Sequence, residues 1–435
     1  MSLAARDLKH IWHPCTQMKE HEWRPLQEIV AAEGCYLHLK DGRKLFDSIS
    51  SWWCKSLGHA HPGLKRALKA QLEKFEHVIL AGTTHETIVR LSEQLSLLMP
   101  SLNKVFYASE GSSAVEIAMK MSLQSRYLCH EKNRTQFLAL QNGYHGETLG
   151  ALSVSDVGLY RDPFASVLLP VHFISHVPYV TGTDDLLWNN CESHWYDVEK
   201  ELECHADTTT ALIVEPIVQG AAGMKIYSAD FLKRLREWTT KHNIHLIADE
   251  IMTGCARTGK MLACEHANIT PDFLCLSKSL TSGFLPLSAV LTSQAIYDVF
   301  YDDDHARGFL HSHTQSGNAL AASVAVETLR IMQEEKSVAK ANELGAFMRS
   351  QLEMMASEIN CLTHVRSIGA IAAADICFPF DRKAHGELTS RAAELGVFLR
   401  PLGNVIYWLP PLVANENDLF YLARVTQTVL HEVLY

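Results

Sequence analysis

The chain has 435 residues, of which 47% are hydrophobic and 20% charged, and its formal net charge is −10. This length exceeds one minimal domain, and the apolar fraction is sufficient for a large buried core. The acidic balance, without any stripe rich in Lys and Arg, argues against nucleic acid as a partner, and no apolar run approaches the ~20 residues of a membrane-spanning helix.

The two ends of the chain predict a smaller α+β unit. Residues 25–50 predict a β-hairpin, because "GCYLHLKDGRKLFDS" alternates apolar and polar residues around the turn dipeptide Asp41-Gly42. From about residue 331 onward we expect a helix, short strands and a final helix. We therefore assign 1–60 and 331–435 to a small domain and 61–330 to a large one.

The middle of the chain alternates strands and helices. Ser228 is a candidate N-cap for one of these helices. The apolar runs without alternation, which indicate strands buried on both faces, lie at 104–109, 136–141, 211–216, 244–250, 273–276 and 287–293. The pattern predicts an α/β fold with a mostly parallel central sheet and helices on both faces.

Three ionisable residues follow these strands directly. Glu215 and Asp249 stand at the ends of two apolar runs, and Lys278 comes two residues after a third. In open α/β sheets the ligand crevice lies at the carboxyl ends of the strands. We therefore expect the three side chains to meet at one edge of the sheet.

A further candidate site begins at Gly111. The stretch "ASEGSSAVEIAMKM" (108–121) leads from a strand into a helix that starts at Gly111-Ser112-Ser113. Free N–H groups at a helix start bind anions, phosphate above all, although such a start is often only a cap. The chain has no G-x-G-x-x-G and no Walker A lysine motif, which argues against dinucleotides and nucleoside triphosphates.

A phosphate site, a lysine and an acid at strand ends together indicate pyridoxal phosphate. This cofactor needs a lysine for covalent attachment and an acid beside its pyridine nitrogen. Asp249 and Lys278 satisfy both needs, and Lys278 would also move protons during catalysis. For Lys278 alone, a solvated lysine in a loop would be the simpler interpretation.

Other residue types carry less information. The 11 cysteines are scattered without any C-x-x-C pair, which favours free thiols in a reducing compartment. The N-terminus carries charges where a signal peptide needs an apolar segment, so we expect a cytoplasmic protein. The 23 histidines form no zinc pattern, so we expect no metal site.

The segment "LIADEIMTGCARTGKMLACEHANITPDFLCLSKSL" (246–280) closely resembles the signature of the class III aminotransferases, which depend on pyridoxal phosphate. The resemblance extends over nearly the whole chain and implies the fold type I architecture of such enzymes. It implies that Lys278 binds the cofactor covalently and that Asp249 pairs with the pyridine nitrogen. It also implies that Gly111 and Ser112 hold the phosphate.

More specific motifs narrow the branch of the family. They are "HIWHPCTQM" (10–18), "SSWWCKSLGHAHP" (50–62), "NGYHGETLGALSVSD" (142–156), "IVEPIVQGAAGM" (213–224) and "HSHTQSGNALA" (311–321). These resemble the branch that converts 8-amino-7-oxononanoate to 7,8-diaminononanoate in biotin synthesis, with S-adenosylmethionine as the expected amino donor. Some relatives use lysine instead, and the residues do not decide between the two donors.

The resemblance also assigns substrate residues. Tyr144 would stack on the cofactor ring and face the substrate, and Trp52 and Trp53 would wall an apolar slot. Arg400 would bind a substrate carboxylate, and Arg257 would line the same site. Plain core tryptophans and a surface arginine are the simpler alternatives.

The loop at 312–314 implies a homodimer. The resemblance implies that Thr314 reaches the phosphate bound in the partner subunit, with Ser312 and His313 beside it. Active sites would then lie at the subunit interface. The role of Glu215 stays open at this point.

The chain departs from the pattern at Cys15, where a well-known member of the branch has a tyrosine in "HPYT". A thiol cannot replace a phenol directly, so another hydroxyl or a water would serve there. Two other readings of the sequence remain: a class III transaminase for ω-amino acids or diamines, and a non-catalytic regulator on the same fold. The Trp52-Trp53 pair argues against the first, and the lack of a basic extra domain argues against the second.

Overall fold

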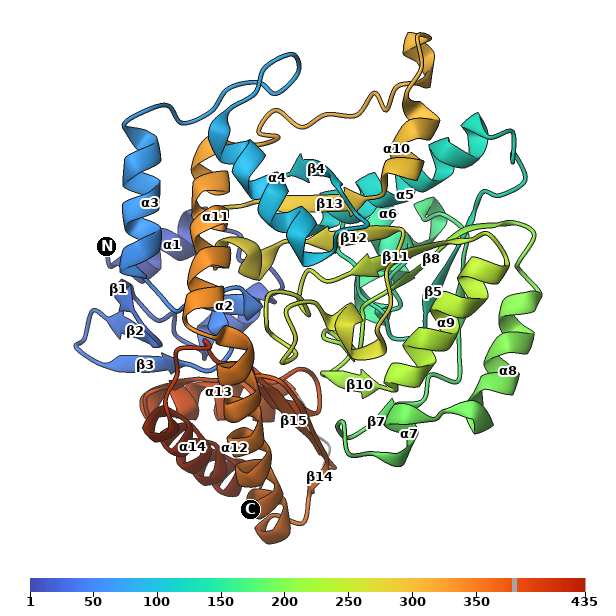
Figure 1. The fold of residues 1–435 in the computed structure, drawn as a ribbon. Helices are drawn as coiled ribbons and strands as arrows, with labels where there is room; N and C mark the ends of the chain where they lie inside the picture. Colours follow the sequence, from blue (N-terminus) through green and yellow to red (C-terminus); the bar gives the residue numbers. More distant parts are fainter. Residues whose placement is uncertain (378–381, 435) are drawn as a thin grey trace.

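The computed structural model describes residues 1–377 and 382–434. Its centre is a seven-stranded sheet with the strand order β4-β13-β12-β11-β8-β5-β6 (Figure 1). The strands, in chain order, are β4 (Lys104–Ala108), β5 (Gln136–Leu140), β6 (Val171–Ile174), β8 (Thr209–Val214), β11 (His245–Asp249), β12 (Phe273–Leu276) and β13 (Ser288–Thr292). Strand β13 is antiparallel to both of its neighbours and all other neighbouring strands are parallel, which confirms the mostly parallel sheet.

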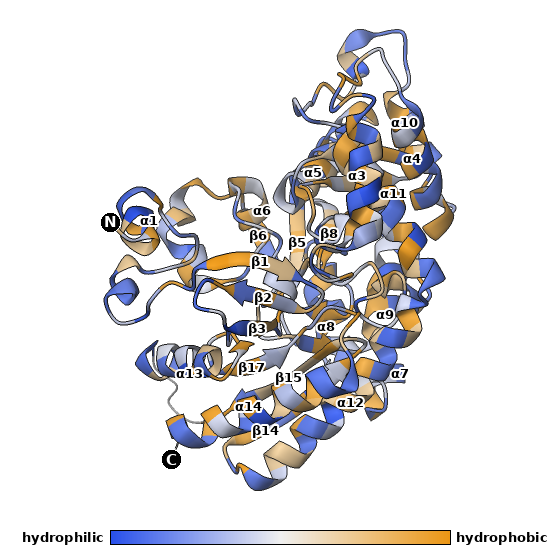
Figure 2. Ribbon diagram, turned by 90° about the vertical axis from the view of Figure 1, so that its left-hand side faces the viewer, coloured by the Kyte–Doolittle hydropathy of each residue, from blue (hydrophilic) through white to orange (hydrophobic). Residues whose placement is uncertain are grey.

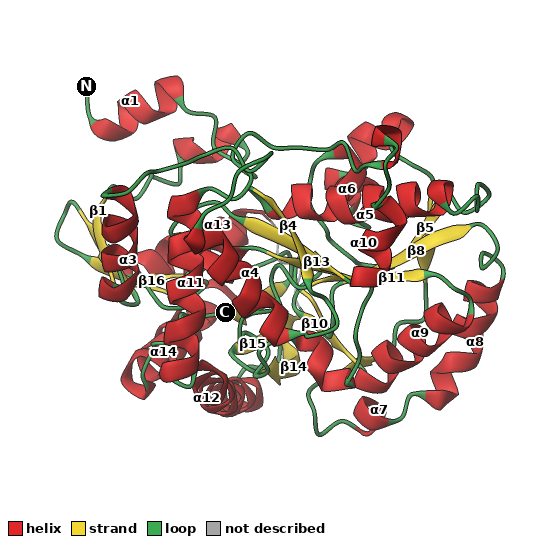
Figure 3. Ribbon diagram, turned by 45° about the horizontal axis from the view of Figure 1, so that its top comes forward, coloured by secondary structure: helices red, strands yellow, loops and turns green. Residues whose placement is uncertain are grey.

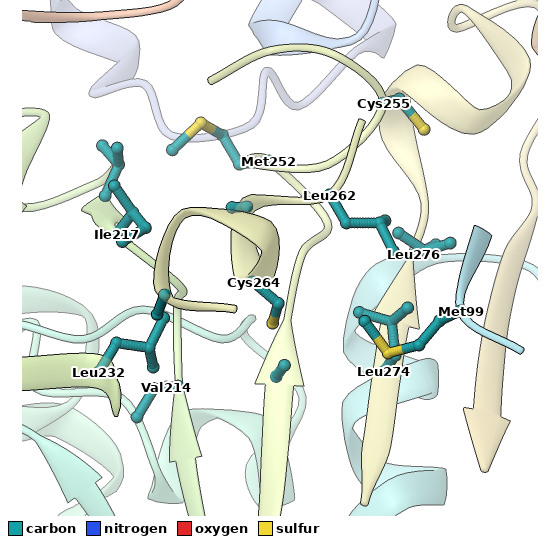
Figure 4. Close-up of a cluster of buried hydrophobic side chains, with 14 of the residues drawn as sticks. Met99, Val214, Ile217, Leu232, Met252, Cys255, Leu262, Cys264, Leu274 and Leu276 are labelled. Carbon is teal, nitrogen blue, oxygen red and sulfur yellow. The ribbon is translucent and has the colours of Figure 1, made fainter. Parts of the chain in front are cut away.

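Helices cover both faces of this sheet, as the unalternating apolar strands predict (Figure 3). On β8, Ile213 packs into the cluster that contains helix α5 (Gly111–Leu128), whereas Leu212 and Val214 pack into the cluster on the opposite face. That opposite cluster contains residues of α4 (Glu86–Leu98), α9 (Ala229–Lys241) and α11 (Ala319–Glu334). Figure 4 shows part of it, with Val214 close to Leu232 of α9.

Helix α9 begins where the sequence predicts. The Ser228 hydroxyl accepts a hydrogen bond from the Phe231 N–H at 3.2 Å, which satisfies one of the free donors of the first turn. The same hydroxyl donates to the Leu187 carbonyl at 2.5 Å. Ser228 therefore fixes the start of α9 and joins it to helix α7 (Leu186–Asn189).

Segments from the two ends of the chain share one sheet. It has the order β1-β2-β3-β16, with β1 (Ile29–Glu33), β2 (Tyr36–Leu39), β3 (Lys44–Asp47) and β16 (Val397–Phe398). The predicted hairpin at Asp41-Gly42 is present as the β2–β3 turn, where Gly42 has a φ of 90° that favours glycine. Strand β16 runs parallel to β3 and pairs Phe398 with Asp47.

The C-terminal segment adds an antiparallel sheet, β14-β15-β17. Its strands are β14 (Leu362–Ile368), β15 (Ile371–Ile376) and β17 (Val405–Trp408), and the helices of this segment are α12 (Ser337–Glu358), α13 (Arg382–Glu394) and α14 (Glu416–Leu434). In Figure 1 these orange and red elements lie beside the blue N-terminal strands. The domain boundaries given above, 1–60, 61–330 and 331–435, stay a prediction.

The remaining elements are short or peripheral. They are α1 (Leu3–His10), α2 (Ser50–Trp53), α3 (Pro62–Leu72), α6 (Leu149–Ser153), α7 (Leu186–Asn189), α8 (Glu192–Glu203), α10 (Gln294–Phe300), β7 (Tyr179–Val180), β9 (Val218–Gln219) and β10 (Lys225–Tyr227). Helix α1 has no buried residue and lies at the edge of the molecule (Figure 2). Among the described residues, no helix is both long and apolar enough to cross a bilayer.

Candidate active site

The three ionisable residues at strand ends lie in one cavity. Glu215 follows β8, Asp249 ends β11, and Lys278 lies two residues beyond β12. Because these three strands are parallel neighbours, their carboxyl ends meet at one edge of the sheet. All three residues line a cavity of about 890 Å³.

Lys278 is a buried amine with few partners. It begins the short helix η5 (Lys278–Thr281) and has a φ of 43°, a conformation that costs ~1–3 kcal/mol in a non-glycine residue. Its Nζ lies 4.6 Å from the centre of the Trp53 ring, and no hydrogen-bond or ion-pair partner is found among the described residues. Burial lowers the pKa of Lys278, and Asp249 and Glu215 partly oppose this shift.

Asp249 is held in place by two donors. His145 Nδ1 lies 2.8 Å from its Oδ2, and the Ile251 N–H donates to its Oδ1 at 3.1 Å. Because a carboxylate only accepts, His145 carries its proton on Nδ1 in this pair. The Nε2 of His145 is buried without a partner among the described residues. These two donors therefore fix the orientation of a carboxylate that lines the cavity.

The structure suggests a role for Glu215 that the sequence leaves open. Its carboxyl group accepts from the N–H groups of Tyr144, at 2.9 Å, and Gly220, at 3.0 Å. Burial raises the pKa of Glu215 to about 7, and His145 and the two N–H donors partly oppose this shift. Glu215 thus fixes the backbone at Tyr144, whose hydroxyl donates to Glu147 at 3.0 Å.

Gly111 and Ser112 line the same cavity at the start of α5. The carboxylate of the N-cap residue, Glu110, accepts from the Ser113 hydroxyl and from no backbone N–H of the first turn, so these N–H groups are not capped by that side chain. A Cβ added at Gly111 would lie 2.8 Å from Ile251, and one at Gly146 would lie 2.1 Å from the Ser112 hydroxyl. The backbone is therefore packed too closely for larger residues at these two positions.

The two tryptophans lie on a left-handed turn. Helix α2 consists of Ser50, Ser51, Trp52 and Trp53, whose φ values are 51°, 44°, 71° and 71°. Each such residue costs ~1–2 kcal/mol relative to the right-handed form. Trp53 is buried and donates from Nε1 to the Tyr407 hydroxyl at 3.1 Å, whereas Trp52 is 42% exposed.

Arg400 lies over the Trp52 ring, and both residues line the cavity. Its guanidinium carbon lies 4.5 Å from the centre of the Trp52 ring, a cation–π distance. One guanidinium nitrogen donates to the Cys15 carbonyl at 3.3 Å. No carboxylate partner of Arg400 is found in the described part of the chain, so the remaining donors can bind a ligand.

Cys15 lies beside a phenol. Both Cys15 and Tyr160 line the cavity, and burial together with the neighbouring Cys15 thiol raises the pKa of Tyr160. The position that carries a thiol thus has a hydroxyl next to it. Sequence reasoning missed Tyr160, because nothing in its neighbourhood distinguishes it from any other surface tyrosine.

Arg257 does not lie where the substrate role requires. Its side chain is fully buried, and its Nη1 donates to the carbonyls of Pro410, at 2.7 Å, and Ala370, at 3.3 Å. It is not one of the residues that line the cavity. Burial lowers the pKa of Arg257 to about 9. The expectation that Arg257 lines the substrate site is therefore corrected: these carbonyls hold it in the interior.

Ser312, His313 and Thr314 also lie outside the cavity of their own chain. The loop that carries them precedes α11, and His313 Nε2 lies 3.2 Å from His311 Nε2. The prediction placed these residues at the site of a partner subunit, so it stays a prediction.

Comparison with known proteins identifies the family. Residues 18–429 match the model of the family described as aminotransferase class-III. The chain is 40% identical to the adenosylmethionine-8-amino-7-oxononanoate aminotransferase of Helicobacter pylori, over 96% of this chain and 95% of that one. It is 34% identical to the enzyme of the same name from Geobacter sulfurreducens, over 98% and 97% of the two chains.

Solved structures of aminotransferases match the fold of this chain. The adenosylmethionine-8-amino-7-oxononanoate aminotransferase of Methanocaldococcus jannaschii matches with a TM-score of 0.91 and 31% identity, over 99% of this chain and 98% of that one. An amine transaminase from an uncultivated Pseudomonas species, solved with pyridoxal phosphate bound, matches with a TM-score of 0.90 and 30% identity, over 97% and 98%. The chain belongs to the class III aminotransferases, and its fold is the one that these enzymes share.

Proposed function

We propose that this protein transfers an amino group to 8-amino-7-oxononanoate and forms 7,8-diaminononanoate, a step of biotin synthesis. One observation carries the proposal: a single cavity joins the buried Lys278 and Asp249 to Arg400 along a wall made by Trp52 and Trp53. The relatives that share this name, at 31–40% identity over nearly the full chain, support the same substrate.

The residues present fit pyridoxal phosphate. Lys278 offers a buried amine without a hydrogen-bond partner in the described residues, and Asp249 offers a carboxylate oriented by His145. Gly111 and Ser112 offer N–H groups at a helix start for the phosphate. When bound, the cofactor supplies the electron sink that amino-acid side chains lack.

Proton transfer, contacts with the cofactor ring and substrate binding are each assigned to a residue of the chain. Lys278 holds the cofactor and later moves a proton at the α-carbon of the donor, a task that favours an amine with a lowered pKa. Asp249 would pair with the pyridine nitrogen, and Tyr144, whose backbone N–H donates to Glu215, would stack on the ring and face the substrate. Arg400 binds the carboxylate of the oxononanoate through two guanidinium N–H groups.

The wall and mouth of the cavity suit this substrate. Trp52 and Trp53 present apolar surface to an aliphatic chain, and the carboxylate end of that chain meets Arg400 over Trp52. Tyr160 supplies a hydroxyl at the position where Cys15 replaces a phenol.

We also propose that the protein acts as a homodimer. The loop with Ser312, His313 and Thr314 lies outside the cavity of its own chain, and a second copy would bring it to the phosphate of the neighbouring site. Exposed apolar side chains such as Trp12, Leu159 and Phe164 offer a surface for such a contact. We place the enzyme in the cytoplasm, because all 11 cysteines are free thiols.

A half-reaction tests the function. The purified protein is loaded with pyridoxal phosphate and mixed with S-adenosylmethionine or, separately, with lysine, while the visible absorbance of the bound cofactor is followed. We expect S-adenosylmethionine to remove this absorbance and 8-amino-7-oxononanoate then to restore it. A response to lysine alone would change the donor and keep the acceptor, whereas a response only to simple ω-amines would favour an ω-transaminase. Lys278→Ala is the matched control without turnover.

A further inference from the structure

The turn from Ser50 to Trp53, which carries the two tryptophans, is hydrogen-bonded to one buried carboxylate. Asp47 ends β3 and is fully buried. Its Oδ1 accepts from the Ser51 N–H at 2.9 Å, and its Oδ2 accepts from the Ser51 hydroxyl at 2.7 Å. The same Oδ2 lies 2.8 Å from His59 Nε2, which donates because a carboxylate only accepts.

These bonds are made to the strained part of the chain. Ser51 is the second of four consecutive left-handed residues and has the lowest φ of the four, 44°. A single left-handed residue is common in turns, but a run of four without glycine persists only where surrounding contacts over-determine it. Asp47 supplies two such contacts to Ser51, and the Ser50 hydroxyl adds a third by donating to the Leu409 carbonyl at 2.7 Å.

Both ends of the cavity wall depend on this turn. Trp53 lies at 4.6 Å from Lys278 Nζ, and Trp52 lies at 4.5 Å from the Arg400 guanidinium. Asp47 is also paired across the sheet with Phe398, two residues before Arg400. One residue therefore joins the tryptophan turn to the strand that leads into Arg400.

We infer that Asp47, oriented by His59, is a positioning residue for the substrate wall, and that it acts by holding the left-handed turn from Ser50 to Trp53. The inference rests on the proposed function only in taking Trp52 and Arg400 as the acceptor site. Asp47 itself does not line the cavity, so its effect on the substrate passes through the tryptophans.

Four variants test the inference. Asp47→Ala removes all three hydrogen bonds, and we expect the KM for 8-amino-7-oxononanoate to rise at least about tenfold with a smaller change in kcat. Asp47→Asn keeps an acceptor for the Ser51 N–H and offers N–H donors to Ser51 and His59, so we expect a KM within about threefold of wild type. Adding Ser51→Gly to Asp47→Ala should recover at least about threefold, because glycine adopts a φ of 44° without strain.

The fourth variant is a stability control. Ser228→Ala removes the N-cap of α9, which lies away from the cavity, and should lower the melting temperature without changing KM. A rise in KM in Asp47→Ala that Ser51→Gly does not relieve, or a KM unchanged in Asp47→Ala, overturns the inference. If Asp47→Ala does not fold, Ser51→Ala, which removes only one of the bonds, must still raise KM in the same direction.

A second readout separates this inference from the proposed function. Near-ultraviolet circular dichroism of the protein without substrate reports the packing of its tryptophans. We expect the spectrum to change in Asp47→Ala and to return toward wild type in Asp47→Ala/Ser51→Gly. If wild type does not use 8-amino-7-oxononanoate, the proposed function fails, while these spectra still decide whether Asp47 holds the turn. An unchanged spectrum in Asp47→Ala rejects the inference whatever the substrate is.

Discussion

Removing the guanidinium of Arg400 tests the acceptor site most directly. Arg400 stacks on Trp52 at 4.5 Å and donates only one hydrogen bond, to the Cys15 carbonyl, among the described residues. The rest of its donor fork is therefore available to a carboxylate. We expect Arg400→Ala to weaken the use of 8-amino-7-oxononanoate far more than the binding of the cofactor.

The geometry sets the size of this effect. A bidentate pair between Arg and a carboxylate provides two charge-assisted hydrogen bonds, and truncating one partner of such a pair costs about 3 kcal/mol in a partly buried site. Because each 1.36 kcal/mol is tenfold in rate, kcat/KM for the oxononanoate should fall roughly 100- to 200-fold. Arg400→Lys keeps the charge and loses the planar fork, so we expect a fall of about tenfold.

The assay compares two substrates and one cofactor. Steady-state kcat/KM is measured for 8-amino-7-oxononanoate and for an amino ketone of the same length without the carboxylate, and the affinity for pyridoxal phosphate is titrated separately. The variants should lose activity only toward the carboxylate substrate. Equal losses toward both substrates, or a parallel loss of cofactor affinity, would refute the assignment of Arg400 to the carboxylate.

Three further variants probe the ionisable groups of the cavity. Lys278→Met should abolish turnover and stabilise the cofactor-free protein at neutral pH by about 1 kcal/mol in urea unfolding, because it removes a buried ammonium. The pKa of Glu215 is raised from 4.5 to about 7, so the folded state favours the protonated carboxyl and stability falls as pH rises through this interval. In cofactor-free protein, the unfolding free energy of wild type minus that of Glu215→Gln should therefore decrease by up to about 3 kcal/mol between these pH values. Tyr160→Phe should raise the KM of the donor several-fold, and a Cys15→Tyr exchange in that background should restore it, which steady-state kinetics checks.

Much of the large unit could be predicted because its strands are buried on both faces. The six apolar runs identified in the sequence correspond to β4, β5, β8, β11, β12 and β13. Their unbroken apolar character follows from the two helical layers, so the same signal gives both the strands and the type of sheet. Helix α13 could not be predicted from an apolar pattern, because "RKAHGELTSRAAE" is mostly polar and contains Gly386.

The site could be predicted only in part. Glu215, Asp249 and Lys278 are each marked by a strand that ends beside them, so local sequence locates them. The left-handed conformation of Trp52 and Trp53 has no local signal, because left-handed φ values favour glycine and none stands there. It depends on contacts with side chains and carbonyls elsewhere in the chain.

The predicted position of Arg257 differs from the structure because its position also depends on contacts that are distant in sequence. Its place in the Arg-Thr-Gly segment and its charge both favoured the cavity, yet its partners are the carbonyls of Ala370 and Pro410, more than a hundred residues away in sequence. Such carbonyl contacts cannot be deduced from residue types, because every residue has a carbonyl. The charge of Arg257 alone therefore does not determine whether its side chain lies in the cavity or in the interior.

The cavity concentrates groups whose burial opposes their charged forms. Burial lowers the pKa of Lys278 and raises that of Glu215, so both shifts favour neutral side chains. Burying such groups lowers the stability of the folded protein, and they are retained at sites where a reaction uses their shifted pKa values. A lowered pKa gives Lys278 a larger fraction of free amine near neutral pH, the form that can take a proton from a donor carbon. The desolvation that destabilises the cofactor-free protein is therefore the same property that makes Lys278 suitable as a base.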